Sequence, residues 1–290
     1  PDRGGNLITL RPELTPSLAR MVAQKQNELI FPLRWWSFGP FWRYERPQKG
    51  RTREFFQWNI DLIGGTSPEA DAEIVAVGAA FLKKIGLLPS QVKILINNRR
   101  LMDTALGELG IPIDARLNVI RLIDKRDKLP LSEWEKYCIE QGLKEKQLDR
   151  LNNLMCDQDL WKQSPELQRF FLAIHHTGFS DYVEFNPQVI RGLDYYTGTV
   201  FEAREVDRDG RAVLGGGRYD NLVSEVGGKP VPAVGFAMGD VMLSIVLEKH
   251  GLLDAAKSNP ISVMVAAFDE HHLINTVEIT SNLRNAGINV

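Results

Sequence analysis

The segment RGLDYYTGTVFE, from Arg191 to Glu202, constrains the fold more than any other part of the chain. An arginine, an acid and two tyrosines stand directly before an alternation of residues that has the period of a half-buried strand. Gly192 and Gly198 bracket this polar cluster and allow backbone geometry that residues with a Cβ atom resist. The segment therefore predicts a rigid sheet whose polar side chains form one wall of a site for a small zwitterionic or anionic ligand.

The composition is that of a globular protein with enough residues for a sizeable core. The chain has 290 residues, of which 43% are hydrophobic and 25% are charged, so we expect one large domain with appended pieces. The formal net charge of −2 excludes a globally basic surface for nucleic acid, and any such surface must be a local patch.

The cysteines indicate a reducing compartment. Cys138 and Cys156 lie in a polar helical region without the spacing of metal ligands. No apolar stretch reaches the ~18 residues of a membrane helix, and the N-terminus lacks the regions of a signal peptide. We therefore expect a cytoplasmic protein that does not bind a membrane. Both ends are abrupt, which predicts that the chain is an excerpt of a longer protein.

Apolar periodicity and turn residues predict an α+β fold in which helices interrupt a sheet domain. The expected strands are residues 7–10, 35–46, 54–63, 92–97, 183–185, 198–205, 211–214 and 234–240. The expected helices of the sheet domain are residues 15–30, with Thr15 as the cap, 67–87, and 240–250. The glycines at 215–217 indicate either a turn between strands or a weak phosphate loop.

The same patterns divide the chain into five parts. We expect the first part of the sheet domain at 1–102, a helical insertion at 103–176, the second part of the sheet domain at 177–253, a linker at 254–260, and an incomplete α/β unit, beginning with a buried strand, at 261–290.

The loop between the strands at 35–46 and 54–63 is strongly basic. The tip of this hairpin and its flanks carry Arg43, Glu45, Arg46, Lys49, Arg51 and Arg53. Arginine matches phosphate oxygens with two hydrogen bonds, and the adjacent Phe55 and Phe56 offer faces for a flat base. The alternative is a solvated loop whose arginines pair with nearby acids. Because Arg43 falls inside the predicted apolar strand, where an unpaired guanidinium is costly, the anion site is favoured.

Four segments of the chain together resemble the catalytic domain of histidyl-tRNA synthetase, a class II aminoacyl-tRNA synthetase. They are LRPELT at 10–15, FWRYERPQKGRTREFFQ at 41–57, RGLDYYTGTVFE at 191–202 and GGGRYDNLV at 215–223. The resemblance covers residues 6–250 and implies a class II antiparallel sheet flanked by helices. Residues 261–290 would then begin an anticodon-binding domain.

The resemblance also implies a histidine pocket. Glu13 and Thr15 would lie near the histidine ammonium, and Tyr195 and Tyr196 would read the imidazole. The other histidine-binding positions would be Leu14, Arg43, Gln57, Asp61 and Arg191. Buried hydroxyl and carboxyl groups discriminate sharply, because an analogue without ring nitrogens leaves them unpaired.

For ATP, the resemblance implies a set of cations around the phosphates. Arg43 would grip the histidine carboxylate and the α-phosphate, and Arg191 would act as the second catalytic arginine where charge builds on that phosphate. Glu45 would meet the adenine edge or the metal environment. Phe55 would stack on adenine, while Arg51 and Arg53 would clamp the distal phosphates. Mg²⁺ would accompany ATP, with no structural metal held by the protein.

Adenylate formation suits this inventory on chemical grounds alone. A carboxylate displaces pyrophosphate in line, so the reaction needs positioning and cations rather than a protein nucleophile.

One position departs from the class II pattern. The arginine expected three residues after Gly239, as a γ-phosphate ligand, is Met242. We expect Arg51 or Arg53, together with Arg191, to compensate for it.

The resemblance predicts a histidine-tRNA ligase that acts on histidine, ATP and tRNA(His) and forms a homodimer. Its helical insertion would approach the tRNA acceptor end, although Lys146 and Arg150 fit a solvated helix face equally well. The alternative is a synthetase-like regulatory subunit of ATP phosphoribosyltransferase that senses histidine. Met242 favours this alternative slightly, whereas the basic hairpin and the incipient anticodon-binding domain favour the ligase.

Overall fold

The computed structural model describes residues 3–46, 48, 50–126, 129–190, 195–207, 211–253 and 261–290. The chain forms two compact units, Pro1–Val246 and Leu247–Val290. The expected linker at 254–260 lies outside the described residues. No helix in the described ranges is long and apolar enough to cross a membrane.

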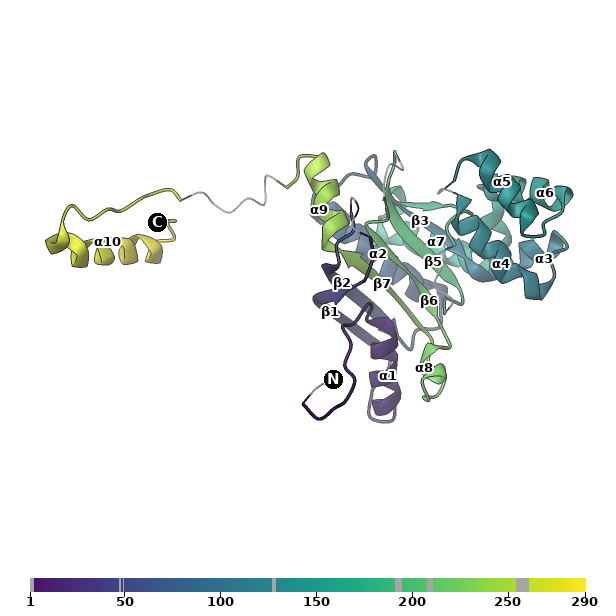
Figure 1. Ribbon diagram of the computed structural model, residues 1–290, viewed down its shortest axis with the longest axis horizontal. Coiled ribbons are helices and arrows are strands. Elements are labelled where there is room, and N and C mark those ends of the chain that lie inside the picture. The colour runs from purple at the N-terminus through teal and green to yellow at the C-terminus, as the bar shows by residue number, and fades with distance from the viewer. Residues whose placement is uncertain are drawn as a thin grey trace. The chain divides into compact units, whose positions relative to one another are not determined.

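The first unit is built on one mixed sheet, as Figure 1 shows. Within the described part of the chain the sheet has seven strands in the order β1-β2-β7-β6-β5-β3-β4. Neighbours are antiparallel except for β3 and β4, which are parallel. The strands are β1 Leu33–Trp42, β2 Glu54–Ile63, β3 Val92–Asn98, β4 Val183–Phe185, β5 Thr199–Glu205, β6 Leu214–Tyr219 and β7 Ala233–Gly239.

Helices of the first unit pack around this sheet, several of them lie in the sequence between β3 and β4, and α10 belongs to the second unit. The helices are α1 Thr15–Lys25, α2 Pro68–Lys84, α3 Arg99–Glu108, α4 Ile113–Asp124, α5 Leu131–Glu140, α6 Glu145–Cys156, α7 Pro165–Thr177, α8 Leu222–Glu225, α9 Asp240–Lys249 and α10 Leu273–Asn285. Helix α2 packs against β2, β5, β6 and β7 and against α7. We call α3 to α7 the inserted helices, and α3 to α6 form a group beside the sheet (Figure 1).

The α+β architecture predicted from the sequence is therefore confirmed, and so is the hairpin of β1 and β2. The predicted bounds of the first hairpin strand were wrong, however. The strand covers Leu33–Trp42 instead of 35–46, so Arg43 is the first residue after the strand, and its amide still donates a hydrogen bond of 2.9 Å to the Arg53 carbonyl. The helix predicted at 15–30 ends at Lys25, and Thr15 is its first residue while Leu14 takes the cap position. Apolar spacing alone overestimated the length of this helix, because Leu29 packs on the core without being helical.

Two predicted strands are absent from the described residues. Residues 7–10 form no strand, and Leu7 is 91% exposed. Residues 261–268 also form no strand, and their large apolar side chains include the exposed Met264 and Phe268. An apolar run becomes a strand only when a neighbouring strand takes its hydrogen bonds, and neither run has one here. The helix predicted after the second run is confirmed as α10.

The strand predicted at 211–214 was also misplaced, because β6 begins at Leu214 and runs through the glycines at 215–217. These glycines form neither a turn nor a phosphate loop, because they are part of strand β6. Their lack of a Cβ atom allows neighbouring strands to approach closely. A Cβ atom on Gly216 would lie 2.2 Å from the carbonyl oxygen of Gly235 on β7, which is far inside van der Waals contact. Glycine is therefore the residue that fits at this point of the sheet.

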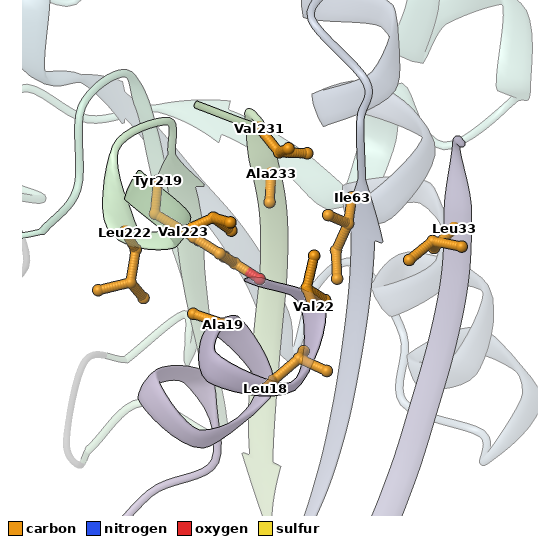
Figure 2. Close-up of a cluster of buried hydrophobic side chains, with 10 residues drawn as sticks. All are labelled: Leu18, Ala19, Val22, Leu33, Ile63, Tyr219, Leu222, Val223, Val231 and Ala233. Atoms are coloured by element: carbon orange, nitrogen blue, oxygen red, sulfur yellow. The ribbon is translucent and has the colours of Figure 1, made fainter. Parts of the chain in front are cut away.

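A cluster of buried side chains fixes α1 on the sheet, as Figure 2 shows. Leu18, Ala19 and Val22 of α1 face side chains of β1, β2 and β7. The ring of Tyr219, at the end of β6, crosses the same cluster. The cluster therefore sets the position of the residues just before α1 and holds the Tyr219 ring from the side.

We expect Leu18→Ala to destabilise the first unit by about 2–5 kcal/mol, because it opens a cavity in this cluster. Leu18 is 7% exposed, whereas Met21 on the same helix is 58% exposed. Met21→Ala is the matched control and should change the free energy of unfolding by less than about 0.5 kcal/mol. Urea-induced unfolding measures both values. Equal losses in the two variants would contradict the packing described for α1.

Candidate active site

The first unit contains a cavity of about 800 Å³ on one face of the sheet. Its wall comes from the residues before α1, from the β1–β2 hairpin, from β2, β5, β6 and β7, and from the first turn of α9. Asp124, at the end of α4, also lines it, so the inserted helices reach the cavity. Of the residues expected in the site, the lining contains Glu13, Leu14, Thr15, Arg43, Glu45, Arg51, Phe55, Gln57, Asp61, Tyr195 and Tyr196.

The floor of the cavity consists of small residues between two polar strands. In register across the sheet, Asn59 of β2 pairs with Ala237 of β7, which pairs with Gly215 of β6, which pairs with Glu202 of β5. Successive side chains of a strand point to opposite faces, so every second residue of each strand lies on this floor. The small side chains in the middle leave a hollow between the polar side chains on either flank.

Asp61 occupies one end of this hollow and is buried. Its Oδ1 accepts a hydrogen bond of 2.6 Å from the hydroxyl of Tyr219. A Cβ atom on Gly235 would lie 2.1 Å from the same Oδ1, so glycine at that position makes room for the carboxylate. Burial raises the pKa of Asp61 to about 6, although the hydrogen bond from Tyr219 acts in the opposite direction. Burial, followed by the Asp61 charge, raises the pKa of Tyr219 well above its ordinary value.

Asn59 lies between Asp61 and Gln57 on the same face of β2 and is 3% exposed. Its side-chain nitrogen Nδ2 has no hydrogen-bond partner among the described residues. A buried donor without a partner is costly, and here it borders the cavity. A bound ligand with an acceptor atom would satisfy it.

Two tyrosines from the segment after Arg191 complete this end of the cavity. The rings of Tyr195 and Tyr196 lie edge to face with centroids 5.0 Å apart, and the Tyr195 ring lies 6.1 Å from that of Tyr219. Tyr196 is 8% exposed. Arg191 itself lies outside the described residues.

The residues before α1 form the adjacent wall. Glu13, Leu14 and Thr15 all line the cavity and are half-buried. Leu14 packs against the cluster that fixes α1, and Thr15 begins the helix. The packing of α1 therefore places these three residues next to the tyrosines.

The opposite end of the cavity is cationic and more open. Arg43 is exposed, its Nε donates a hydrogen bond of 3.0 Å to the carbonyl of Pro12, and its guanidinium lies 5.0 Å from the centroid of the Phe55 ring. Because the Arg43 side chain is exposed, the expected cost of a guanidinium inside an apolar strand does not arise. The Arg43 side chain is instead positioned by the Pro12 carbonyl and by the aromatic face of Phe55.

The hairpin tip separates its two remaining candidate cations. Arg51 lines the cavity and forms an ion pair with Glu45, which also lines it. Arg53 does not line the cavity, and its guanidinium lies 4.8 Å from the centroid of the Tyr44 ring. Arg51 is therefore part of the cavity lining, whereas Arg53 is not, although its carbonyl accepts a hydrogen bond of 2.9 Å from the Arg43 amide.

Met242 packs against the tip of the hairpin. Gly50 at this tip has a φ of 76°, and a Cβ atom there would lie 2.2 Å from the Met242 sulfur. Asp240, two residues before Met242, also contacts the hairpin, because its Oδ1 accepts a hydrogen bond of 3.1 Å from the backbone amide of Phe56. The first turn of α9 thus holds the hairpin by one apolar contact and one hydrogen bond.

Several lining residues were not found from the sequence. They are Asn59, Glu202, Arg204, Arg211 and Tyr219. The period of two along β2 and β5 was a usable signal, because Asn59 alternates with Gln57 and Asp61, and Arg204 with Glu202. Arg204 Nε lies 2.5 Å from Glu202 Oε1. The described residues contain no group of three or more histidine, cysteine or acidic side chains that could hold a metal ion.

Comparisons with known proteins agree on one family. The sequence profile described as histidyl-tRNA synthetase matches residues 1–241. The histidine–tRNA ligase of Arabidopsis chloroplasts and mitochondria is 36% identical over 99% of this chain and 61% of its own length. The histidine–tRNA ligase of Halobacterium salinarum is 36% identical over 99% of this chain and 68% of its own length. The chain thus spans less than two thirds of the Arabidopsis relative.

A solved structure shows the same fold. The protein described as an ATP phosphoribosyltransferase regulatory subunit/histidyl-tRNA synthetase from Bacillus halodurans superimposes with a TM-score of 0.78 at 25% identity. The alignment covers 99% of this chain and 74% of that one.

The buried Asp61 carboxyl makes a prediction about pH. Its pKa in the folded protein is about 6 and its ordinary value is 3.8, so the folded state holds a proton that the unfolded state releases between about pH 4 and pH 6. Stability from this group therefore falls as the pH rises through that window. Across this window, the free energy of unfolding of the wild type should fall by on the order of 2–3 kcal/mol relative to that of Asp61→Asn. Urea unfolding of both proteins at several pH values measures this difference. A difference that stays constant with pH would contradict the burial of an ionisable carboxyl at this position.

Proposed function

Because the chain belongs to the histidyl-tRNA synthetase family, we propose that it activates histidine with ATP to histidyl-adenylate and transfers the histidyl group to the 3′ end of tRNA(His). The observation that carries this proposal is the division of one cavity into a buried, hydrogen-bonding end and an open, cationic end. A dehydrated polar pocket suits a small polar side chain, and exposed cations suit the phosphates of ATP.

Histidine would occupy the buried end. Tyr195 and Tyr196, with the Asp61–Tyr219 pair, would offer hydroxyl and carboxyl groups to an imidazole ring placed among them. The unpaired Nδ2 of Asn59 supplies one further donor. On the adjacent wall, Glu13 and Thr15 offer oxygen atoms to the histidine ammonium, with Leu14 beside them. The carboxylate of histidine would then point towards Gln57 and the cationic end.

ATP would occupy the open end. Phe55 presents its face to the adenine, and Glu45 would accept from the adenine edge or border the metal environment. Arg43 lies over the same aromatic ring and would hold the α-phosphate and the histidine carboxylate together. Arg191, the other proposed catalytic residue, lies outside the described residues.

The reaction in this arrangement is an in-line displacement. A carboxylate oxygen of histidine forms a bond to the α-phosphorus, and the bond from that phosphorus to the bridging oxygen breaks, so that pyrophosphate leaves with the electron pair. The cations stabilise charge that grows on the phosphate oxygens, and the walls hold the two reactants in line. Mg²⁺ bound to the ATP phosphates would neutralise part of their charge.

Met242 occupies the position at which the class II pattern has an arginine that binds the γ-phosphate, so one cation is missing from this end of the cavity. We propose that Arg51 replaces it, because Arg51 lines the cavity and its partner Glu45 is part of the same wall. The expectation that Arg53 shares this role is weakened by its position outside the lining. Arg204 and Arg211, on the opposite wall, are further cations within the cavity.

The other parts of the function are also proposals. The inserted helices would approach the acceptor end of tRNA, and residues 261–290 would begin an anticodon-binding domain. The domain boundaries, the homodimer and the cytoplasmic location stay predictions from the sequence. A second candidate, a histidine-sensing regulatory subunit, is favoured by two observations. They are Met242 in place of the expected arginine and the similarity to the Bacillus halodurans protein described as an ATP phosphoribosyltransferase regulatory subunit/histidyl-tRNA synthetase.

Exchange of labelled pyrophosphate into ATP separates the two candidates without tRNA. The ligase should catalyse exchange that depends on histidine and that is absent with other amino acids. Calorimetric titration of histidine into the same preparation shows whether the pocket is intact. A folded protein that binds histidine without exchange would reject the ligase and support the regulatory subunit.

Variants of two positions test the proposed phosphate clamp. Arg51→Gln should lower kcat/KM for ATP by on the order of 10², since it removes a cation that stabilises the phosphates in the transition state. Arg34→Gln is the matched control, because Arg34 pairs with Glu73 on the protein surface outside the cavity. Met242→Arg should change activity by less than about tenfold if Arg51 already supplies the charge. Equal losses in the two glutamine variants, or a gain of orders of magnitude from Met242→Arg, would overturn the compensation.

A further inference from the structure

A network of charged side chains connects the inserted helices to the segment that carries Tyr195 and Tyr196. It consists of Asp71 on α2, Arg218 on β6, Asp220 after β6, Arg100 on α3 and Glu166 on α7. None of these residues lines the cavity. They are therefore not explained by contact with a ligand in it.

The buried end of this network is the ion pair of Arg218 and Asp71. The two side chains are 5% and 3% exposed, and their closest atoms, Arg218 Nη2 and Asp71 Oδ1, lie 2.6 Å apart. Arg218 also donates to the carbonyls of Gly65 and Ser67, at the start of α2. Burial alone would lower the pKa of the Arg218 guanidinium, but its hydrogen bonds to Asp71 raise it. Such a buried and satisfied network is rigid.

Asp220 joins this anchor to the tyrosine segment. Its Oδ1 accepts from Arg218 Nη1 at 3.1 Å, and its Oδ2 accepts from the Thr197 hydroxyl at 2.9 Å. The backbone amide of Asp220 donates to the same hydroxyl oxygen at 3.1 Å, and the amide of Thr197 donates to the Arg218 carbonyl at 2.8 Å. Thr197 directly follows Tyr196, so these bonds fix the backbone that presents both tyrosines.

Arg100 extends the connection to both ends of the inserted helices. Its Nη2 lies 2.8 Å from Oδ2 of Asp220, the oxygen that also holds Thr197. Its Nη1 lies 2.5 Å from Oε1 of Glu166, at the start of α7, and Oε2 of Glu166 accepts from the Asn98 side chain. Arg100 is in the first turn of α3 and Glu166 in that of α7. A shift of either helix would thus change the contacts of a single carboxylate oxygen that holds the tyrosine segment.

We propose that Arg100 and Asp220 are positioning residues through which the inserted helices set the placement of the Tyr195–Tyr196 segment and hence the affinity for the amino-acid substrate. This inference rests on the proposed function, because it takes histidine as the ligand of the tyrosine pocket. Neither residue touches the substrate. Arg100 acts on Asp220, and Asp220 acts on Thr197.

The variants Arg100→Gln, Asp220→Asn and the double variant test the link in the full protein. Arg100→Gln should raise KM for histidine and its calorimetric dissociation constant about fivefold to tenfold, and leave KM for ATP within about twofold. Asp220→Asn should have an equal or larger effect. Because Arg100 acts through Asp220, the double variant should match Asp220→Asn, whereas independent effects would multiply. Arg100 is 52% exposed, so its replacement should not unfold the protein.

Arg169→Gln is the matched control. Arg169 lies on α7, is 58% exposed and pairs with Glu69 on α2, so it ties an inserted helix to the sheet domain without contact to the tyrosine segment. Its histidine affinity should equal that of the wild type. If Arg100→Gln also binds histidine like the wild type, the link is overturned while the proposed function stands.

Hydrogen exchange gives a readout that needs no ligand. The amide of Thr197 is bonded to the Arg218 carbonyl, and peptides that contain it should exchange faster in Arg100→Gln than in Arg169→Gln or the wild type. Unchanged exchange at this amide overturns the link even if the protein binds no histidine. Absence of histidine binding in the wild type, with faster exchange in Arg100→Gln, overturns the proposed function and supports the link.

Discussion

The close approach of β6 to β7 is the constraint on which the site depends. At Gly216 a single added carbon would collide with the carbonyl of Gly235, and at Gly235 it would collide with the Asp61 carboxylate. Both collisions involve groups that cannot move away cheaply, because one is strand backbone and the other is a buried, hydrogen-bonded side chain. On the cavity side of the sheet, the small residues Gly215, Gly235 and Ala237 of these two central strands create the hollow, and the polar side chains of β2 and β5 become its walls.

Burial then divides the hollow into two chemical environments. At the end with Asp61 and Tyr219, polar groups are removed from water and hydrogen-bonded to one another, so a ligand must replace those bonds accurately. At the end with Arg43 and Arg51, the cations are exposed and are held by a carbonyl, an aromatic face and a carboxylate. Such side chains can exchange their present partners for phosphate oxygens at little cost, because water already reaches them. One sheet thus carries both ends of the cavity, of which the buried end selects its ligand by hydrogen bonds and the open end attracts its ligand by charge.

The sequence predicted the parts of this arrangement that depend on local pattern. The hairpin follows from apolar runs on either side of a basic loop, and the period of two along β2 puts Gln57 and Asp61 on one face. Local pattern failed where distant contacts decide the structure. The glycines at 215–217 have the composition of a turn and become a strand because β5 and β7 enclose them. Tyr219 was therefore not placed in the site, since its position depends on that strand. Residues 7–10 have the pattern of a strand but no partner strand.

The first turn of α9 shows how an apolar contact can stand where a charge is expected. An arginine at position 242 would bring a second guanidinium close to the loop that carries Arg51, and the two would repel each other whenever no phosphate lies between them. Met242 instead packs on Gly50, where the positive φ and the closeness of the sulfur leave no room for a side chain. Together with the bond from Phe56 to Asp240, this contact fixes the hairpin before any ligand arrives. Electrostatic stabilisation of a transition state depends on cations that are already in place. The methionine therefore lowers the number of charges and favours the placement of Arg51.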